Sequence, residues 1–192
     1  MPDIDIDFAD RNLALNVIKH IRASRKENNE TVPHNTGIYI QNIPYDPVNN
    51  LSGIDYKEAE KRGYFKIDFL NVNIYNKVRD EDHLKQLMET EPLWELLKQD
   101  DFTDLLFHIN GHGYLMRQMG PSNVEELAMC LALIRPAKKH LVGKTWTEIG
   151  KTIWKKPEND EYYFKKAHAV AYAMAIVVQM NLICESISYG YS

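Results

Sequence analysis

Met1-Pro-Asp-Ile-Asp-Ile-Asp-Phe8 opens the chain and alternates acidic with apolar residues. On a β-strand the side chains of Asp3, Asp5 and Asp7 would all point to one face, because strand side chains alternate between the two faces. Three carboxylates on one face repel each other unless a cation lies among them. The pattern therefore predicts a strand whose polar face binds cations, and the alternative is an exposed strand with a solvated polar face.

A second apolar run, residues 64–70, carries one acid, Asp68. Two carboxylates on one strand and a third on a neighbouring strand can hold two divalent cations for phosphoryl chemistry. Lys66 lies two positions before Asp68, so on a strand it would share that face. A second metal site at His108 and His112 is not expected, because the glycines around them break the helix that their spacing would need.

The composition bounds the class of protein. The chain has 192 residues, of which 44% are hydrophobic and 26% charged, which suits one domain or two small ones and argues against global disorder. Cys130 and Cys184 form no Cys-x-x-Cys, so neither a disulfide framework nor a zinc ribbon is indicated. The start of the chain lacks the pattern of a signal peptide, and polar residues interrupt the apolar stretch 167–183. We therefore expect a cytoplasmic protein that does not bind membranes.

The charge is distributed unevenly. Residues 1–134 carry 14 Lys/Arg against 22 Asp/Glu, whereas residues 135–166 carry 9 against 4. An acidic region that holds metal ions, followed by a basic segment, suits a site where nucleotide phosphates lie between cations and lysines. Ordinary surface charge would also explain the basic segment. A protein that binds duplex DNA unaided is usually more basic than this chain, whose net charge is −4.

The order of the expected elements indicates an α+β fold. Strands are expected early in the chain and helices alone after about residue 75, which predicts an α+β region at 1–75 and a helical region at 76–192. The early part should contain strands at 3–8, 37–43 and 64–70, helices at 11–26 and 56–62, and a polar loop at 26–33. The later part should contain helical segments at 72–100, 123–134, 145–155 and 160–184.

Five short motifs, in this order, resemble the bacterial DNA polymerase III α-subunit (C) family. Residues 2–11 resemble its catalytic palm strand, residues 33–40 its glycine-rich palm strand, and residues 66–70 the segment with its third carboxylate. Residues 132–136 and 164–173 resemble two signatures of its fingers. The resemblance spans nearly the whole chain with large internal deletions. It implies a polymerase-β-like palm, a small mixed sheet with helices, followed by a helical fingers-like region.

The resemblance implies nucleotidyl transfer from a deoxynucleoside triphosphate to a primer 3′-hydroxyl by a two-metal mechanism. Asp3, Asp5 and Asp68 would be the catalytic carboxylates and would coordinate two Mg²⁺, for which Mn²⁺ can substitute; Asp7 would be secondary. The implied triphosphate ligands are Lys66, Arg135, Lys166 and His168. From the residues alone, Arg135-Pro136 could simply end a helix and His168 could be a satisfied core histidine.

The chain also departs from the family pattern. The Gly-Ser segment that wraps the triphosphate and the thumb that grips duplex DNA have no counterpart, and Ala137 and Ala167 replace the usual Gly and Ser. We therefore expect a miniaturised or split catalytic fragment that acts on a primed DNA template with a partner chain. Such a fragment suits a phage, in which case it would act in the host cytoplasm. Two alternatives remain: a non-catalytic, replication-associated interaction protein on the same fold, and a metal-dependent nucleotidyltransferase with another acceptor.

Overall fold

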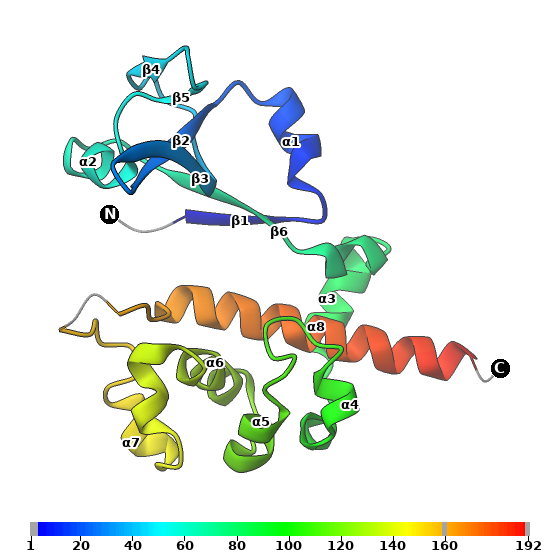
Figure 1. Ribbon diagram of the computed structural model, residues 1–192. Coiled ribbons are helices and arrows are strands. Elements are labelled where there is room, and N and C mark those ends of the chain that lie inside the picture. Colours follow the sequence, from blue (N-terminus) through cyan, green and yellow to red (C-terminus); the bar gives the residue numbers. More distant parts are fainter. Residues whose placement is uncertain (1–3, 159–160, 191–192) are drawn as a thin grey trace. The chain divides into compact units, whose positions relative to one another are not determined.

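The structure is a computed structural model that describes residues 4–158 and 161–190. The chain divides into two compact units after Asn76. Unit 1 is a mixed sheet with helices, and the elements described in unit 2 are all helical, so the expected α+β class is confirmed. Figure 1 labels the elements of both units.

Unit 1 is built around a four-stranded sheet of order β1-β6-β3-β2. Strand β1 pairs in parallel with β6, whereas β3 is antiparallel to both β6 and β2. Two short strands, β4 and β5, form a separate ribbon. The elements are β1 (Ile4–Phe8), α1 (Arg11–Val17), β2 (Ile21–Glu27), β3 (Glu30–Tyr39), β4 (Tyr45–Asp46), β5 (Leu51–Ser52), α2 (Tyr56–Lys61), β6 (Ile67–Asn71) and the 3-10 helix η1 (Asn73–Lys77).

The expected helix at 11–26 and loop at 26–33 are wrong. Helix α1 ends at Val17, and a β-hairpin of β2 and β3 occupies the segment that follows. Asn28 and Asn29 both have positive φ, 49° and 66°, as a two-residue hairpin turn matched to strand twist requires. The apolar spacing that predicted a long helix does not mark a buried face, because the side chains of Leu13 and Val17 are 71% and 82% exposed.

Other element boundaries in unit 1 agree more closely with the expectations. Helix α2 begins after Asp55, whose carboxylate accepts a hydrogen bond from the Lys57 N–H, and Gly63 follows its end with φ +85°. The strands expected at 3–8 and 64–70 are present as β1 and β6. The strand expected at 37–43 is instead β3, which begins and ends earlier because it pairs with β2 across the hairpin.

Unit 2 is a helical assembly around one apolar cluster. Helix α6 contributes almost all its side chains to this cluster, with Leu127 through Leu133 buried, because α8 packs along it. Figure 1 shows α8 running beside α6 and α3. The elements are α3 (Glu81–Glu89), the 3-10 helix η2 (Trp94–Lys98), α4 (Asp100–Thr103), α5 (Gly113–Met119), α6 (Val124–Leu133), the 3-10 helix η3 (Pro136–Leu141), α7 (Trp146–Gly150) and α8 (Lys166–Gly190).

Several helices of unit 2 are shorter than expected. Pro92 follows the end of α3 and separates it from η2, so the region expected to be helical at 72–100 is interrupted. Helix α8 begins at Lys166 rather than near residue 160. Part of α8, Lys166–Ser188, is long and apolar enough to cross a membrane, although we expected this stretch to be too short and polar. Half of its most apolar segment is buried inside the protein, and one such helix is weak evidence for a membrane because the core helices of soluble proteins meet the same criteria.

Candidate active site

Two of the expected catalytic acids lie side by side on the sheet of unit 1. Strands β1 and β6 pair in parallel with Asp5 opposite Asp68. Opposed residues on neighbouring strands point to the same face. Asp7 shares that face of β1 but is opposite Leu70. The pairing therefore brings together one acid from each of the two strands identified from the sequence.

The Asp68 carboxylate is held by a lysine and a threonine. The Lys66 ammonium contacts Oδ2, and the Thr36 hydroxyl donates a hydrogen bond of 2.7 Å to Oδ1. The side chains of Asp68 and Lys66 are 13% and 18% exposed, so both charges are largely removed from water. A carboxylate in such surroundings needs these partners, because burying an unpaired charge is costly. Lys66 lies where the sequence placed it, on the face that carries Asp68.

Thr36 reaches Asp68 because β3 is irregular at this point. Ser24 of β2 is opposite Pro33, whereas Arg22, two residues earlier, is opposite Ile38, so β3 carries extra residues between the two pairs. The bulged segment is 34–37, and bulges of this kind redirect side chains next to functional sites. Gly37 is opposite Asp68 on the β6 side of β3. The bulge thus places a hydroxyl beside the catalytic candidate.

The neutral imidazole of His34 stabilises the bulge. Its Nδ1 accepts a hydrogen bond of 2.9 Å from the Gly37 N–H, so this nitrogen carries no proton. Burial and the nearby Lys66 ammonium lower the pKa of His34. Nδ1 also lies 3.7 Å from Oδ1 of Asp68, but this contact is not an ion pair because both atoms are acceptors.

The absence of a side chain at Gly37 leaves room for the side chain of Lys66. A Cβ at this position would lie 2.7 Å from Cδ of Lys66 and 2.9 Å from Nδ1 of His34. Real Cβ atoms do not approach other atoms so closely, so any larger residue would displace one of these side chains. The requirement for glycine here comes from this close approach.

Arg11 ties the start of α1 to the same region. Its guanidinium donates hydrogen bonds from Nη1 to the carbonyl oxygens of Asn35, at 2.8 Å, and Phe69, at 3.1 Å. Its backbone N–H donates to Oδ1 of Asn71 at 2.8 Å. Arg11 therefore links the bulge to β6. Sequence reasoning included residues 10–11 and 33–40 in motifs but assigned no role to Arg11, His34 or Thr36, because their contacts depend on the bulge.

The other three expected phosphate ligands belong to unit 2 and have different neighbours there. The guanidinium of Arg135 lies 3.9 Å from the ring centre of Phe164 and 5.7 Å from that of Tyr162, a cation–π arrangement. Lys166 begins α8 and forms a 3.3 Å ion pair with Glu125. His168 is a partly buried residue of the same helix.

A histidine that we discounted as a metal ligand lies near Arg135. Burial, and secondarily the Arg135 charge, lower the pKa of His108 to about 4. Its ring centre lies 4.0 Å from that of Phe107 and 4.4 Å from that of Tyr172. His108 is thus a neutral member of an aromatic cluster with φ +61°, a left-handed conformation uncommon outside glycine.

A divalent cation such as Mg²⁺ needs oxygen ligands, and the described residues supply carboxylates for it. Asp5 and Asp68 supply carboxylate oxygens, the ligands that Mg²⁺ prefers, from opposed positions on one face. Among residues 4–158 and 161–190, no three His, Cys, Asp or Glu are arranged to hold a metal ion. Asp3, the third expected ligand, lies outside the described residues. Asp5 and Asp68 are thus the two expected metal ligands that lie within the described residues.

Comparisons of the chain with protein-family models, with curated proteins and with solved structures found no match.

Proposed function

We propose that this chain is a DNA-directed DNA polymerase fragment, a miniaturised or split relative of the C family that transfers nucleotides from deoxynucleoside triphosphates to a primer 3′-hydroxyl on a DNA template. The observation that carries the proposal is the opposition of Asp5 and Asp68 on adjacent parallel strands. Their motifs are far apart in the sequence, and the sheet brings together two of the three acids that the family resemblance selects. In this proposal unit 1 is the palm and unit 2 corresponds to the fingers.

Asp3, Asp5 and Asp68 would hold two Mg²⁺, which supply a lowered pKa for the attacking hydroxyl and charge stabilisation at the phosphorus centre. The chain's own residues prepare this site. Thr36 orients the Asp68 carboxylate, and the Lys66 ammonium lies beside it as a cation available for phosphate. Arg135, with its planar guanidinium, is the proposed phosphate ligand from unit 2, and His168 is a second. Lys166 would have to leave Glu125 to serve as a third.

Exposed apolar residues support the proposed partner chain. Strand β1 lies at the edge of the sheet, where its outer backbone groups can pair with another chain. Ile4 and Ile6 of this strand are 38% and 39% exposed, and α1 exposes Leu13 and Val17 still more. Large exposed apolar side chains beside an unpaired strand edge are typical of protein interfaces. A partner bound here would lie next to Asp5.

A second candidate function is supported by the ion pair of Lys66 with Asp68. This pair neutralises Asp68 without a metal ion, as a retired catalytic residue would require. Combined with the exposed apolar surface of β1 and α1, it suits a non-catalytic protein that binds a replication factor through the same fold. Such a protein would bind its partner equally well with or without Mg²⁺.

Metal-dependent nucleotide binding separates the two candidates. We would measure binding of a deoxynucleoside triphosphate by calorimetry, with Mg²⁺ or Mn²⁺ present and absent, to the full chain and to Asp5→Asn. Asp7→Asn is the matched control, because Asp7 shares the strand and face of Asp5 but is opposite Leu70 instead of Asp68. Loss of one metal ligand should weaken binding at least about tenfold in Asp5→Asn, and the control should change far less.

Equal effects of the two substitutions would contradict the proposal, since they would assign binding to general negative charge on β1. Metal-independent partner binding together with no nucleotide binding by the wild-type chain would favour the interaction protein. Thermal unfolding of both variants provides the check that the sheet of unit 1 remains folded.

A further inference from the structure

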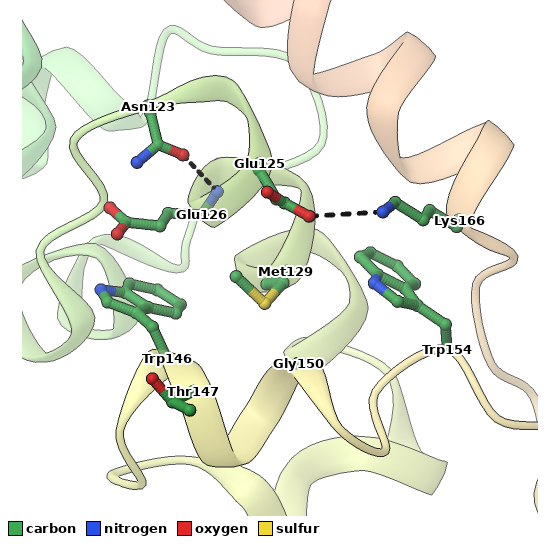
Figure 2. Close-up of a pocket in the computed structure, with 9 residues that line it drawn as sticks. All are labelled: Asn123, Glu125, Glu126, Met129, Trp146, Thr147, Gly150, Trp154 and Lys166. Atoms are coloured by element: carbon green, nitrogen blue, oxygen red, sulfur yellow. Dashed lines mark hydrogen bonds and ion pairs between the residues drawn. The ribbon is translucent and has the colours of Figure 1, made fainter.

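A cavity of about 340 Å³ in unit 2 lies between α6 and α7, and its lining includes the ion pair of Glu125 and Lys166. This volume is at the lower end of the range for small-ligand sites. Figure 2 shows its walls: the indoles of Trp146 and Trp154 stand on opposite sides, with the Met129 thioether between them. Both tryptophans pack against the apolar cluster of unit 2, so their positions are set by the core.

A glycine lies in the cavity lining together with the two tryptophans. Trp146 and Gly150 are the first and last residues of α7, and Trp154 lies in the turn that follows, where the Ile153 N–H still donates to the Ile149 carbonyl. Residues four apart in a helix share one face, so Gly150 lies on the face of α7 that carries Trp146. A Cβ at Gly150 would find nothing within 4 Å. Gly150 therefore leaves open space in the part of the cavity lining that also carries the two indoles.

Acidic groups line the opposite side of the cavity. Glu125 and Glu126 both extend from the first turn of α6. Glu125 is paired with Lys166, at 3.3 Å, whereas Oε2 of Glu126 accepts hydrogen bonds from the backbone N–H and the hydroxyl of Ser122. These three charged groups leave one net negative charge at the cavity. Figure 2 shows both glutamates and Lys166 at its rim.

We propose that this cavity binds a methylated ammonium group, as in choline-like molecules or a trimethylated lysine side chain. Indole faces attract such cations through their quadrupole, and the methyl groups can contact rings and the Met129 thioether without losing strong hydrogen bonds to water. The excess carboxylate adds attraction for a cation and repels phosphate, which argues against a nucleotide as the occupant. The inference goes beyond the proposed polymerase activity and does not depend on it.

The probe pair that tests the charge requirement is choline and its neutral isostere 3,3-dimethylbutan-1-ol. We would titrate each into the full-length chain and follow the indole N–H signals of Trp146 and Trp154 by NMR, with Trp94, which is outside the cavity, as an internal control. Choline should shift the two cavity signals in a saturable way, and the isostere should bind at least about fivefold more weakly, as a cation–π contribution implies. Equal binding of both probes, or no shift with either, would overturn the proposal.

Three variants test the geometry. Gly150→Leu should fill this part of the cavity and abolish choline binding with the fold intact, because the added side chain meets open space. Glu125→Gln should weaken choline binding, whereas Lys166→Met should strengthen it severalfold by releasing the Glu125 carboxylate. Weaker choline binding in Lys166→Met, or displacement of choline by a deoxynucleotide, would identify an anion or nucleotide site and overturn the proposal. Comparing choline with a trimethyllysine peptide distinguishes a small molecule from a protein partner as the source.

Discussion

The two units of this chain use their interiors differently. Among the described residues, unit 2 buries one large apolar cluster in which whole turns of α6 are inaccessible to water. Unit 1 buries two small clusters, centred on Tyr39 and on Phe69. It also buries polar groups at its sheet, including Asp68 and the hydrogen-bonded pair Ser24 and Ser52. Unit 2 also buries polar side chains, namely His83, Thr103, Lys138 and Asn181. Among the described residues, unit 1 is distinguished by a largely buried carboxylate that is paired with a lysine, Asp68 with Lys66.

This difference locates the candidate site. Replacing a buried ion pair by apolar residues of similar size often leaves a protein equally or more stable, so an ion pair such as that of Lys66 and Asp68 is not needed for folding. Residues that do not improve stability, such as charged groups in a protein interior, are commonly functional. The largely buried ion pair at the sheet of unit 1 meets this description.

The largest effect is expected in the core of unit 2. Leu131 is fully buried in the main cluster, so Leu131→Ala should lower the free energy of unfolding of unit 2 by about 2–5 kcal/mol through lost burial and a cavity. All three tryptophans lie in unit 2, so urea unfolding followed by tryptophan fluorescence reports on it selectively. Amide exchange of Ile38 and Phe69 reports on unit 1 and should be unchanged. Loss of their protection in the variant would mean that the two units unfold together.

A smaller effect is expected at the ion pair of unit 1. Asp68→Leu leaves the largely buried Lys66 ammonium without its partner, which should cost about 1–3 kcal/mol. The double variant Lys66→Met/Asp68→Leu removes both charges and should return to within about 1 kcal/mol of the wild type. Amide exchange of Ile38 and Phe69 is the measurement. If the double variant were as unstable as the single one, the pair would be needed for folding, and our contrast between the units would fail.

The smallest effects concern pH. His34 in unit 1 and His108 in unit 2 both have lowered pKa values in the folded protein, mainly because of burial, and that of His108 is about 4. As the pH falls, the two histidines become protonated in the unfolded chain near the ordinary histidine pKa of about 6.5. In the folded protein they become protonated only at lower pH. The stability that each neutral histidine contributes is therefore complete above the ordinary pKa. It is lost as the pH falls toward the lowered pKa, which for His108 is about 4.

Asparagine substitutions assign this pH dependence to each unit. His108→Asn, which suits the left-handed backbone there, should flatten the acid-side loss of stability seen by tryptophan fluorescence by less than about 1 kcal/mol, since solvent reaches part of the ring. His34→Asn should flatten the loss seen by the amides of unit 1 and leave the fluorescence unchanged. An effect of either variant on the other unit's signal would contradict the assignment of each histidine's pH dependence to its own unit.

Elements whose sequence pattern is compatible with only one type of secondary structure were predicted well. The strict alternation of acids and isoleucines predicted β1, and the apolar run around Asp68 predicted β6. The boundaries of α6 were predicted closely, because an Asn cap precedes a continuous run of apolar residues. The helix expected at 11–26 was wrong because Leu13, Val17, Ile18 and Ile21 fit helical spacing, yet hairpin pairing of residues 21–39 decided the structure of the second half.

The sequence by itself determined the chemistry of this protein: which acids alternate on one strand, which lone acid interrupts an apolar run, and where basic residues concentrate. Only the tertiary structure decided the neighbours. Parallel pairing placed Asp5 opposite Asp68, a bulge in β3 turned Thr36 and His34 toward that carboxylate, and Gly150 left open space in a cavity lined by two indoles. Composition and periodicity are properties of neighbouring residues along the chain, whereas register, bulges and cavities arise from pairing between distant segments.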